Sequence, residues 1–186
     1  MIVVLLVANI GLYLVMAVWT GSSDFSASTL FAWGGNLGAV SLHGEPWRLV
    51  TATFLHAGLQ HIAGNMILLL VTGSFLERKI GSLRFASIYF ASGIAGSMLS
   101  AWTHPQVVSI GASGAIAGLL GAMVTLKLGA RAPEVSGMWM VQVIGLNALY
   151  SFAPNVDGMA HLGGFVAGLA LGGLAAQRIP ALLPRA

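Results

Sequence analysis

One serine at the start of an apolar segment is well placed to act as a nucleophile. Ser113 stands in the sequence Gly111-Ala112-Ser113-Gly114, directly before a long run of apolar residues. If this run is a helix, free backbone N–H groups and the positive end of the helix dipole surround the serine and favour a developing negative charge. The same residues would also suit a simple helix start with Ser113 as the N-cap, so the motif is weak by itself.

His161 is the candidate base for this serine. A serine needs a base to attack at neutral pH, and an adjacent imidazole can supply one. Glycines recur after His161 at helical spacing, at Gly164, Gly168 and Gly172, and a glycine face permits close helix packing. We therefore predict that the helix of Ser113 packs on the helix of His161 and brings the two side chains together. The alternative is a structural histidine bonded to a backbone carbonyl.

No acid is clearly placed to orient this histidine. The nearest in sequence is Asp157, one turn before His161, and we interpret it as a loop or helix-capping residue. No other acid lies in the outer half of a predicted membrane span. We therefore expect a two-residue catalytic unit in which uncharged groups orient the imidazole.

A second group of polar residues precedes the serine and contains His56, His61 and Asn65. A four-residue separation leaves His61 and Asn65 on one helix face, whereas five residues rotate His56 away. That face could offer N–H donors to an oxyanion, with the backbone N–H of Ser113 as a third. A zinc site is the rival, but there is no His-Glu-x-x-His pattern and no nearby carboxylate, so we predict no metal. A purely structural role stays open, for His56 above all.

The composition indicates a membrane environment. Of 186 residues, 57% are hydrophobic and 7% are charged, whereas about a quarter of the residues of a soluble domain are charged. The basic residues are scattered singly rather than gathered into a stripe, which argues against nucleic-acid binding. Because the chain has no cysteine, a disulfide framework and a thiolate nucleophile are excluded.

We predict an all-α membrane protein with six helices in a single domain over residues 1–186. A spanning helix needs roughly 20 apolar residues, and backbone groups in lipid must be satisfied internally. The predicted spans lie at about residues 1–20, 59–76, 85–102, 113–129, 138–152 and 159–176. The first lacks a basic leading segment and a small-residue cleavage site, so we interpret it as a span rather than a signal peptide. Residues 21–58 form the one long loop.

The basic residues predict the orientation. All but one of them lie in two connections or near the C-terminus: Arg78, Lys79, Arg84, Lys127, Arg131, Arg178 and Arg185. By the positive-inside rule these regions are cytoplasmic, and with six spans both termini are cytoplasmic too. Spans two, four and six then begin at the outer face. His61, Asn65, Ser113 and His161 would therefore share one depth near that face.

Together these residues resemble the rhomboid family of intramembrane serine proteases. The resemblance covers nearly the whole chain, and the order, spacing and common depth of the motifs make the set specific. The matching residues are Trp47, Arg48, His61, Asn65, Gly111, Ala112, Ser113, Gly114, Ala160, His161, Gly164 and Gly168. The resemblance implies the short six-span form of the rhomboid fold, without a soluble N-terminal domain or a seventh span.

The resemblance also implies a role for the polar matches. Ser113 would be the nucleophile and His161 the base, while His61, Asn65 and Gly111 would join Ser113 in oxyanion and substrate binding. The implied substrates are single-span membrane proteins, cut near their outer end within the lipid bilayer. No cofactor, metal or nucleic acid is implied.

The remaining matches imply structural roles. Trp47 and Arg48 fall in a structured first loop that lies partly in the membrane, and Gly114, Gly164 and Gly168 fall on packed helix faces. The simplest setting for so short a form is a prokaryotic plasma membrane.

Two positions depart from the family pattern. Several members carry an aromatic residue one turn after the serine, packed on the histidine ring, where this chain has Ala117. Gly64 stands where some members have a bulky residue between spans two and five.

Two rival functions stay open. An inactive rhomboid-like binding protein would normally lack the serine or the histidine, and a small histidine-lined transporter would need polar residues through the whole membrane thickness.

Overall fold

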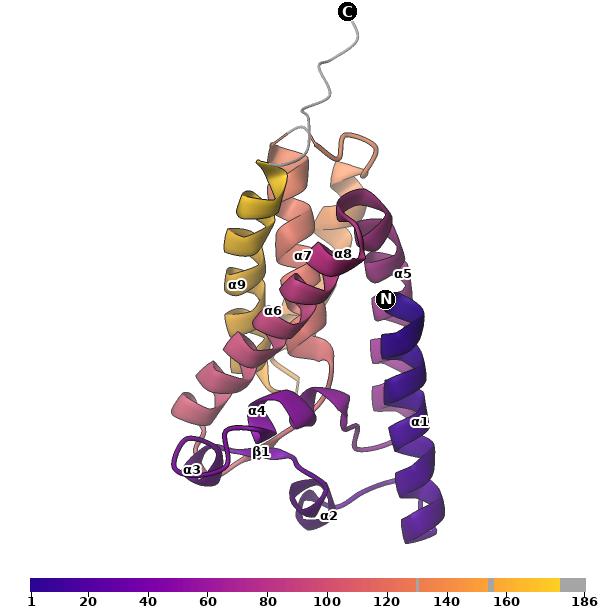
Figure 1. The fold of residues 1–186 in the computed structure, drawn as a ribbon, viewed down its shortest axis with the longest axis vertical. Helices are drawn as coiled ribbons and strands as arrows, with labels where there is room; N and C mark the ends of the chain where they lie inside the picture. Colours follow the sequence, from indigo (N-terminus) through magenta and orange to yellow (C-terminus); the bar gives the residue numbers. More distant parts are fainter. Residues whose placement is uncertain (130, 154–155, 178–186) are drawn as a thin grey trace, which may run out of the picture.

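The computed structural model describes residues 1–129, 131–153 and 156–177 (Figure 1). Its long helices are α1 (Ile2–Thr20), α5 (Leu59–Ile80), α6 (Ser82–Thr103), α7 (Ser113–Leu128), α8 (Gly137–Tyr150) and α9 (Gly158–Ala176). One of them lies on each of the six predicted spans, with ends that differ by a few residues. The prediction of a predominantly helical chain is confirmed.

Three helices in the described ranges, α1, α5 and α9, are long and apolar enough to cross a membrane. Two more, α7 and α8, are apolar but shorter, with 16 and 14 residues. α6 has 22 residues, but small and polar side chains such as Ser92, Ser97 and Ser100 occupy its buried face and lower its hydropathy. Of the six predicted spans, three therefore have the length and hydropathy that define a span.

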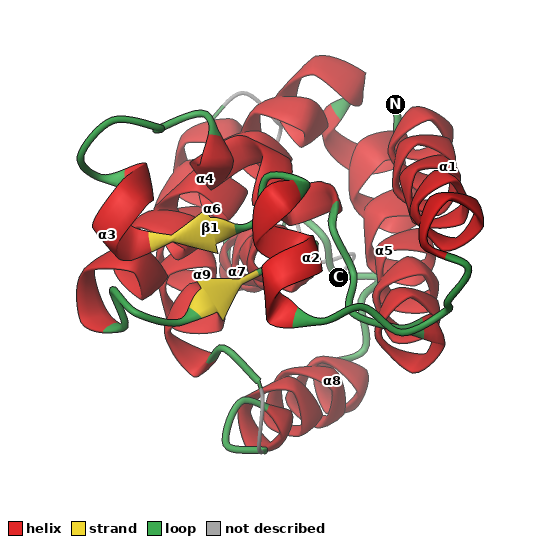
Figure 2. Cartoon of the chain, turned by 90° about the horizontal axis from the view of Figure 1, so that it is seen from below, coloured by secondary structure: helices red, strands yellow, loops and turns green. Residues whose placement is uncertain are grey.

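The closest helix packing joins α7 and α9, which lie side by side in both ribbon views (Figures 1 and 2). A Cβ atom at Gly164 or Gly168 of α9 would overlap the carbonyl oxygen of Gly114 or Gly118 in α7. Faces without side chains therefore let the two backbones come into direct contact. The predicted packing of these helices is confirmed, and it places their first turns next to each other.

Residues 21–58 form a small folded layer rather than an open loop. The layer contains α2 (Ala27–Ala32), β1 (Asn36–Leu37), α3 (Gly38–Ser41), α4 (Arg48–Thr51) and the 3-10 turn η1 (Ala52–Phe54). β1 pairs antiparallel with β2 (Val108–Ser109), and Figure 2 shows this pair across one end of the bundle. The all-α expectation is corrected to this extent, because two connections that meet side by side satisfy their backbone groups as a short ladder.

Arg48 connects several parts of this layer. The residue is only 6% exposed, and its side chain donates to the Phe31 carbonyl at 2.6 Å and the Gly35 carbonyl at 3.1 Å. It also donates to the Glu45 carboxylate at 2.6 Å. The guanidinium lies over the Trp47 ring, 4.5 Å from its centroid. One buried cation with three hydrogen bonds thus holds α4 against α2 and the residues that follow α2.

α8 is the least embedded of the long helices. Figure 2 shows it to one side of the bundle, and its main contact with the other helices is with α7. Met138, Val141 and Leu149 are each more than two-thirds exposed. Apolar side chains that point away from the protein are expected for a helix that faces lipid.

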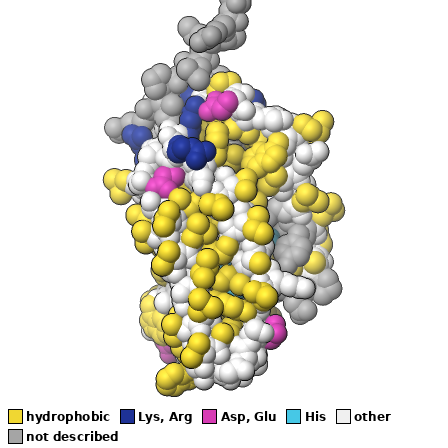
Figure 3. Space-filling model, turned by 90° about the vertical axis from the view of Figure 1, so that its right-hand side faces the viewer, with side chains coloured by type: hydrophobic (Ala, Val, Ile, Leu, Met, Phe, Trp, Pro, Cys, Tyr) yellow, Lys and Arg dark blue, Asp and Glu magenta, His cyan; other side chains and the backbone are white. Residues whose placement is uncertain are grey.

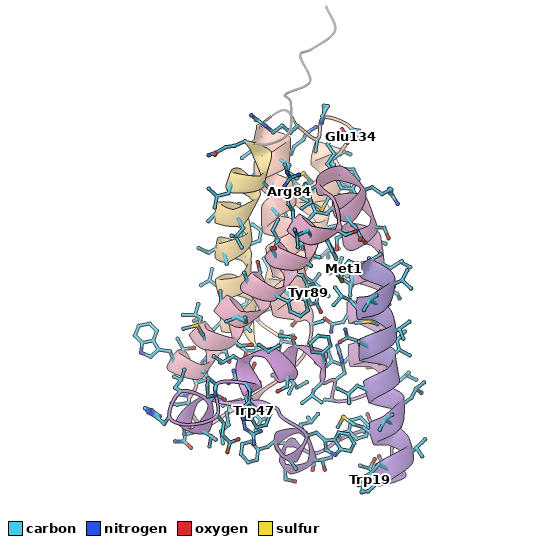
Figure 4. The ribbon with its side chains drawn as sticks, in the orientation of Figure 1. Met1, Trp19, Trp47, Arg84, Tyr89 and Glu134 are labelled. Carbon is cyan, nitrogen blue, oxygen red and sulfur yellow. The ribbon has the colours of Figure 1, made fainter. Side chains whose placement is uncertain are left out.

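Basic residues gather at the end of the bundle opposite the folded layer. Figure 3 shows one face covered largely by hydrophobic side chains, with Lys and Arg toward its upper end. Figure 4 places Arg84 and Glu134 toward that end and Trp19 toward the other. Arg178 and Arg185, which also enter the predicted orientation, lie outside the described residues.

Candidate active site

A cavity of about 330 Å³ lies where α5, α7, α8 and α9 meet. It is lined by Gln60, His61, Gly64, Asn65, Leu68, Ser113, Ile116, Val143, Leu146, Asn147 and His161. Four of the predicted site residues, from three different helices, therefore share one space. An apolar pocket with a few convergent polar groups is the usual form of a binding or catalytic site.

Ser113 is the first residue of α7. The N-cap is Ala112, without a side-chain cap, so the alternative interpretation of Ser113 as an N-cap is wrong. Gly111 before it has a φ of 114°, a conformation that side chains disfavour. The Gly111 N–H donates to the Ala52 carbonyl at 2.9 Å. This turn leaves the Ser113 hydroxyl at the edge of the cavity and at the positive end of its helix.

His161 lies in the first turn of α9 and is 4% exposed. Its Nδ1 atom is 2.7 Å from the hydroxyl oxygen of Ser151, at the end of α8. Within the described ranges, the Ser113 hydroxyl and the His161 ring line the same cavity without a hydrogen bond between them. Catalytic hydrogen bonds are often long in free enzymes and tighten in the substrate complex.

Asp157 is the N-cap of α9, which confirms its interpretation as a capping residue. One carboxylate oxygen accepts from the Ala160 N–H at 2.9 Å, and the other accepts from the Ser100 hydroxyl. Both oxygens are thus engaged in holding the start of the helix that carries His161.

His61 presents a hydrogen-bond donor to the cavity. The Ala57 N–H donates to Nδ1 of His61 at 3.4 Å, so in the neutral ring the proton lies on Nε2. A Cβ atom at Gly111 would lie 2.8 Å from this Nε2 atom and 3.7 Å from the Ser113 hydroxyl oxygen. The Nε2–H group and the hydroxyl therefore flank the same glycine.

Asn65 is 8% exposed and lines the cavity together with His61. Its amide nitrogen donates one hydrogen to the His61 carbonyl at 2.9 Å. The second hydrogen of that amide is not used in this bond and can be donated to a group in the cavity. The prediction that a four-residue separation puts these two side chains on one face is confirmed.

His56 lies behind His61 and does not line the cavity. The two rings are edge to face, with centroids 5.0 Å apart, and His56 is 1% exposed. Burial, together with the neighbouring His61, lowers the pKa of His56 to about 3. A neutral, buried ring in this place supports His61 by packing.

In the part of the chain that the structure describes, no three His, Cys, Asp or Glu side chains are grouped so that they could hold a metal.

The residues that α8 contributes to the site were not predicted from the sequence. Val143, Leu146 and Asn147 line the cavity, and Ser151 contacts the His161 ring. Helical periodicity holds only within one helix, so it cannot predict that a residue of α8 contacts the first turn of α9 across the connection between them. The sequence pointed to such residues only through the expectation that uncharged groups orient His161.

The family model of the rhomboid domain matches residues 43–178, so the chain belongs to the rhomboid family. It is 43% identical over 143 residues to RHOMBOID-like protein 5 of Arabidopsis thaliana, which covers 69% of this chain and 44% of the relative. It is 37% identical over 160 residues to the Rhomboid protease GluP of Bacillus subtilis, with 84% and 31% covered. Rhomboid-like protease 3 of Toxoplasma gondii is 34% identical over 176 residues, with 91% and 67% covered.

The chain spans less than half the length of most of the curated relatives that it matches. Its membrane-length apolar helices and its family make it a multi-pass integral membrane protein. The relatives include bacterial, plant and mitochondrial proteins. They therefore do not favour the expected prokaryotic plasma membrane over other membranes.

Proposed function

We propose that the protein is a serine endopeptidase that cuts the membrane segments of other proteins. The observation that carries the proposal is one cavity lined by a helix-terminal serine, a buried histidine and two further N–H donors: Ser113, His161, His61 and Asn65. Its family includes relatives named as proteases, which supports the same reaction. The functional unit is the single domain of residues 1–186, and all six long helices cross the membrane.

The reaction follows an acyl-enzyme route. The Ser113 oxygen attacks the peptide carbonyl carbon while Nε2 of His161 takes the hydroxyl proton. The tetrahedral intermediate collapses, the C–N bond breaks, and the imidazolium returns that proton to the leaving amine. A water molecule then attacks the ester, again with its proton passing to His161. The second peptide leaves as a carboxylic acid and Ser113 regains its hydrogen.

The oxyanion of each intermediate needs donors that are already in place. The Nε2–H of His61, the free N–H of the Asn65 amide and the backbone N–H of Ser113 serve as these donors. The Gly111 turn keeps space between His61 and Ser113 for the reacting carbonyl. Removal of one such donor commonly lowers kcat by about 10²- to 10³-fold.

Structural residues keep this geometry in place. Gly114, Gly164 and Gly168 hold α7 and α9 at backbone contact, and a side chain at either glycine of α9 would separate them. Trp47 and Arg48 hold the folded layer over the site, and part of this layer lies in the membrane.

The substrates are membrane segments, mostly of single-span proteins, that enter sideways from lipid. The cavity has α5 and α8 as two of its walls, and α8 is thinly packed against its neighbours. A regular helix hides its peptide bonds, so a substrate with helix-weakening residues near one end would expose them most easily. The reaction requires no cofactor.

The basic residues orient the protein in its membrane. Most of them lie in or next to the α5–α6 and α7–α8 connections, so these connections and both termini face the cytoplasm. The active site then lies near the outer face, at the starts of α5, α7 and α9.

The test is cleavage of a single-span reporter by purified protein in liposomes. Wild type should cleave it, a chelator should have no effect, and Ser113→Ala and His161→Ala should each lose about 10³-fold or more in rate. Equal thermal unfolding of the three proteins is the control. Cleavage that survives Ser113→Ala would contradict the assignment of Ser113 as the nucleophile. A wild type that neither cleaves the reporter nor reacts with a fluorophosphonate would favour an inactive binding protein.

A further inference from the structure

Ser151 contacts the one ring nitrogen of His161 that the reaction leaves unused. Its hydroxyl oxygen is 2.7 Å from Nδ1 of His161. In the described part of the chain, the imidazole of His161 has this hydrogen bond and no other. Ser151 is half-buried at the C-terminal end of α8, and His161 is almost fully buried, so little water competes for the contact.

The direction of this hydrogen bond follows from a second one. The Ser151 hydroxyl donates to the Asn147 carbonyl at 2.8 Å, one turn back in α8. A hydroxyl has a single hydrogen, so a Ser151 that donates it to Asn147 accepts from His161. The proton of the neutral ring is then on Nδ1, and Nε2 keeps its lone pair. This is the tautomer that a base acting through Nε2 requires.

Among the described residues, the nearest alternatives for orienting the ring are already hydrogen-bonded elsewhere or too small. The carboxylate of Asp157 is bonded to the Ala160 N–H and the Ser100 hydroxyl. Ala117, one turn after Ser113, is a buried methyl group that cannot clamp an imidazole plane.

We propose that Ser151 is the positioning residue of the base: it accepts the Nδ1–H hydrogen bond of His161, selects the tautomer with a free Nε2, and bonds to the imidazolium that forms when Ser113 is deprotonated. This inference rests on the proposed function. It adds a neutral third member to the Ser113–His161 pair, contributed by α8. Because α8 also walls the cavity, the same helix lines the substrate site and orients the base.

The first measurement is the ¹⁵N spectrum of histidine-labelled wild type, in which protonated and unprotonated ring nitrogens are well separated. The chain has five histidines, and loss of one signal set in His161→Gln assigns the ring. His161 should be neutral with its proton on Nδ1. A ring with its proton on Nε2 would overturn the proposal, without any Ser151 variant and without a substrate.

The second measurement compares Ser151→Ala, Ser151→Thr and Ser100→Ala in the reporter assay. Ser151→Ala should lower kcat by about 5- to 10-fold with KM unchanged, because one neutral hydrogen bond is lost. Its His161 spectrum should shift toward a mixture of tautomers, and Ser151→Thr should restore both properties. Ser100→Ala removes a buried hydroxyl on the other side of the α9 start and should leave the tautomer unchanged.

The outcomes separate this proposal from the proposed function. A wild-type kcat and spectrum in Ser151→Ala would overturn the positioning role. A loss that Ser100→Ala reproduces, with a matching fall in thermal stability and no rescue by threonine, would do the same. If no reporter is cleaved but the tautomer changes in Ser151→Ala alone, the protease proposal fails while the contact between Ser151 and His161 is supported.

Discussion

Two walls of the cavity are built in opposite ways. On one side, α7 and α9 touch through their backbones because Gly164 and Gly168 carry no side chains at the contact. On the other side, α8 exposes Leu146 and Leu149, and a Cβ atom at its Gly145 would meet nothing within 4 Å. The tightly packed wall carries the proposed nucleophile and base. The thinly packed wall carries the residue that orients the base.

The difference fits the separate demands on the two walls. Reacting groups must be held within about 0.5 Å of their working geometry, and backbone contact between helices provides that rigidity. A wall that admits another chain must be able to separate from its neighbours, and few buried contacts make such movement inexpensive. The contact of Ser151 with His161 links the two walls at one point.

The largest effect should come from filling the tight contact. Gly168→Leu should lower the free energy of unfolding by about 3 kcal/mol, because its side chain would overlap Gly118 of α7, and cleavage should be lost with the packing. Gly145→Leu on α8 should change it by no more than about 0.5 kcal/mol. Unfolding of both variants in mixed micelles with increasing SDS measures the difference. Equal losses would mean that α8 is as tightly packed as α9.

The next test asks which wall acts on the transition state. Asn65→Ala removes a proposed oxyanion donor on α5 and should lower kcat by about 10²-fold. Asn147→Ala keeps the backbone carbonyl that Ser151 uses and should act mainly on KM. Steady-state kinetics on one reporter, with both variants at wild-type thermal stability, separates the two. A kcat loss in Asn147→Ala as large as that in Asn65→Ala would give α8 a direct chemical role.

A smaller effect concerns pH. Folded His56 binds a proton only near pH 3, whereas the unfolded residue does so near 6.5, so between these values the unfolded state holds more protons. This contribution to stability is complete above pH 6.5 and is lost as the pH falls toward 3, by about 2 kcal/mol from pH 6.5 to 5. His56→Leu should flatten that part of the profile. If unfolding measured at pH 7 and pH 5 shows the same slope in both proteins, His56 is not buried as the structure has it.

The smallest effect should appear in the folded layer. Arg48→Lys removes the guanidinium that bonds to Phe31, Gly35 and Glu45 and should cost about 1 kcal/mol, because an ammonium cannot reproduce the planar fork. Arg84→Lys, at an exposed position, is the control. Thermal unfolding and limited proteolysis of residues 21–58 measure the change. An unchanged proteolysis pattern in Arg48→Lys would show that the layer does not depend on this cation.

The sequence by itself determined the helical ranges and the residues at one end of them. Long apolar runs must be helices in lipid, because the backbone has no other partner there. The four-residue separation of His61 and Asn65 puts them on one face, and the glycines after His161 predict close packing, since both patterns are local properties of a helix. These expectations needed no knowledge of how distant segments meet.

Only the tertiary structure decided the rest of the site. The contact between Ser151 and His161 and the pairing of β1 with β2 each join separate chain segments through the ends of elements. Such contacts depend on where connections leave each helix and how far the helices stand apart, and no sequence period records either. The thin packing of α8 could not be predicted from the sequence either, because apolar side chains give the same sequence pattern whether they face lipid or a neighbouring helix.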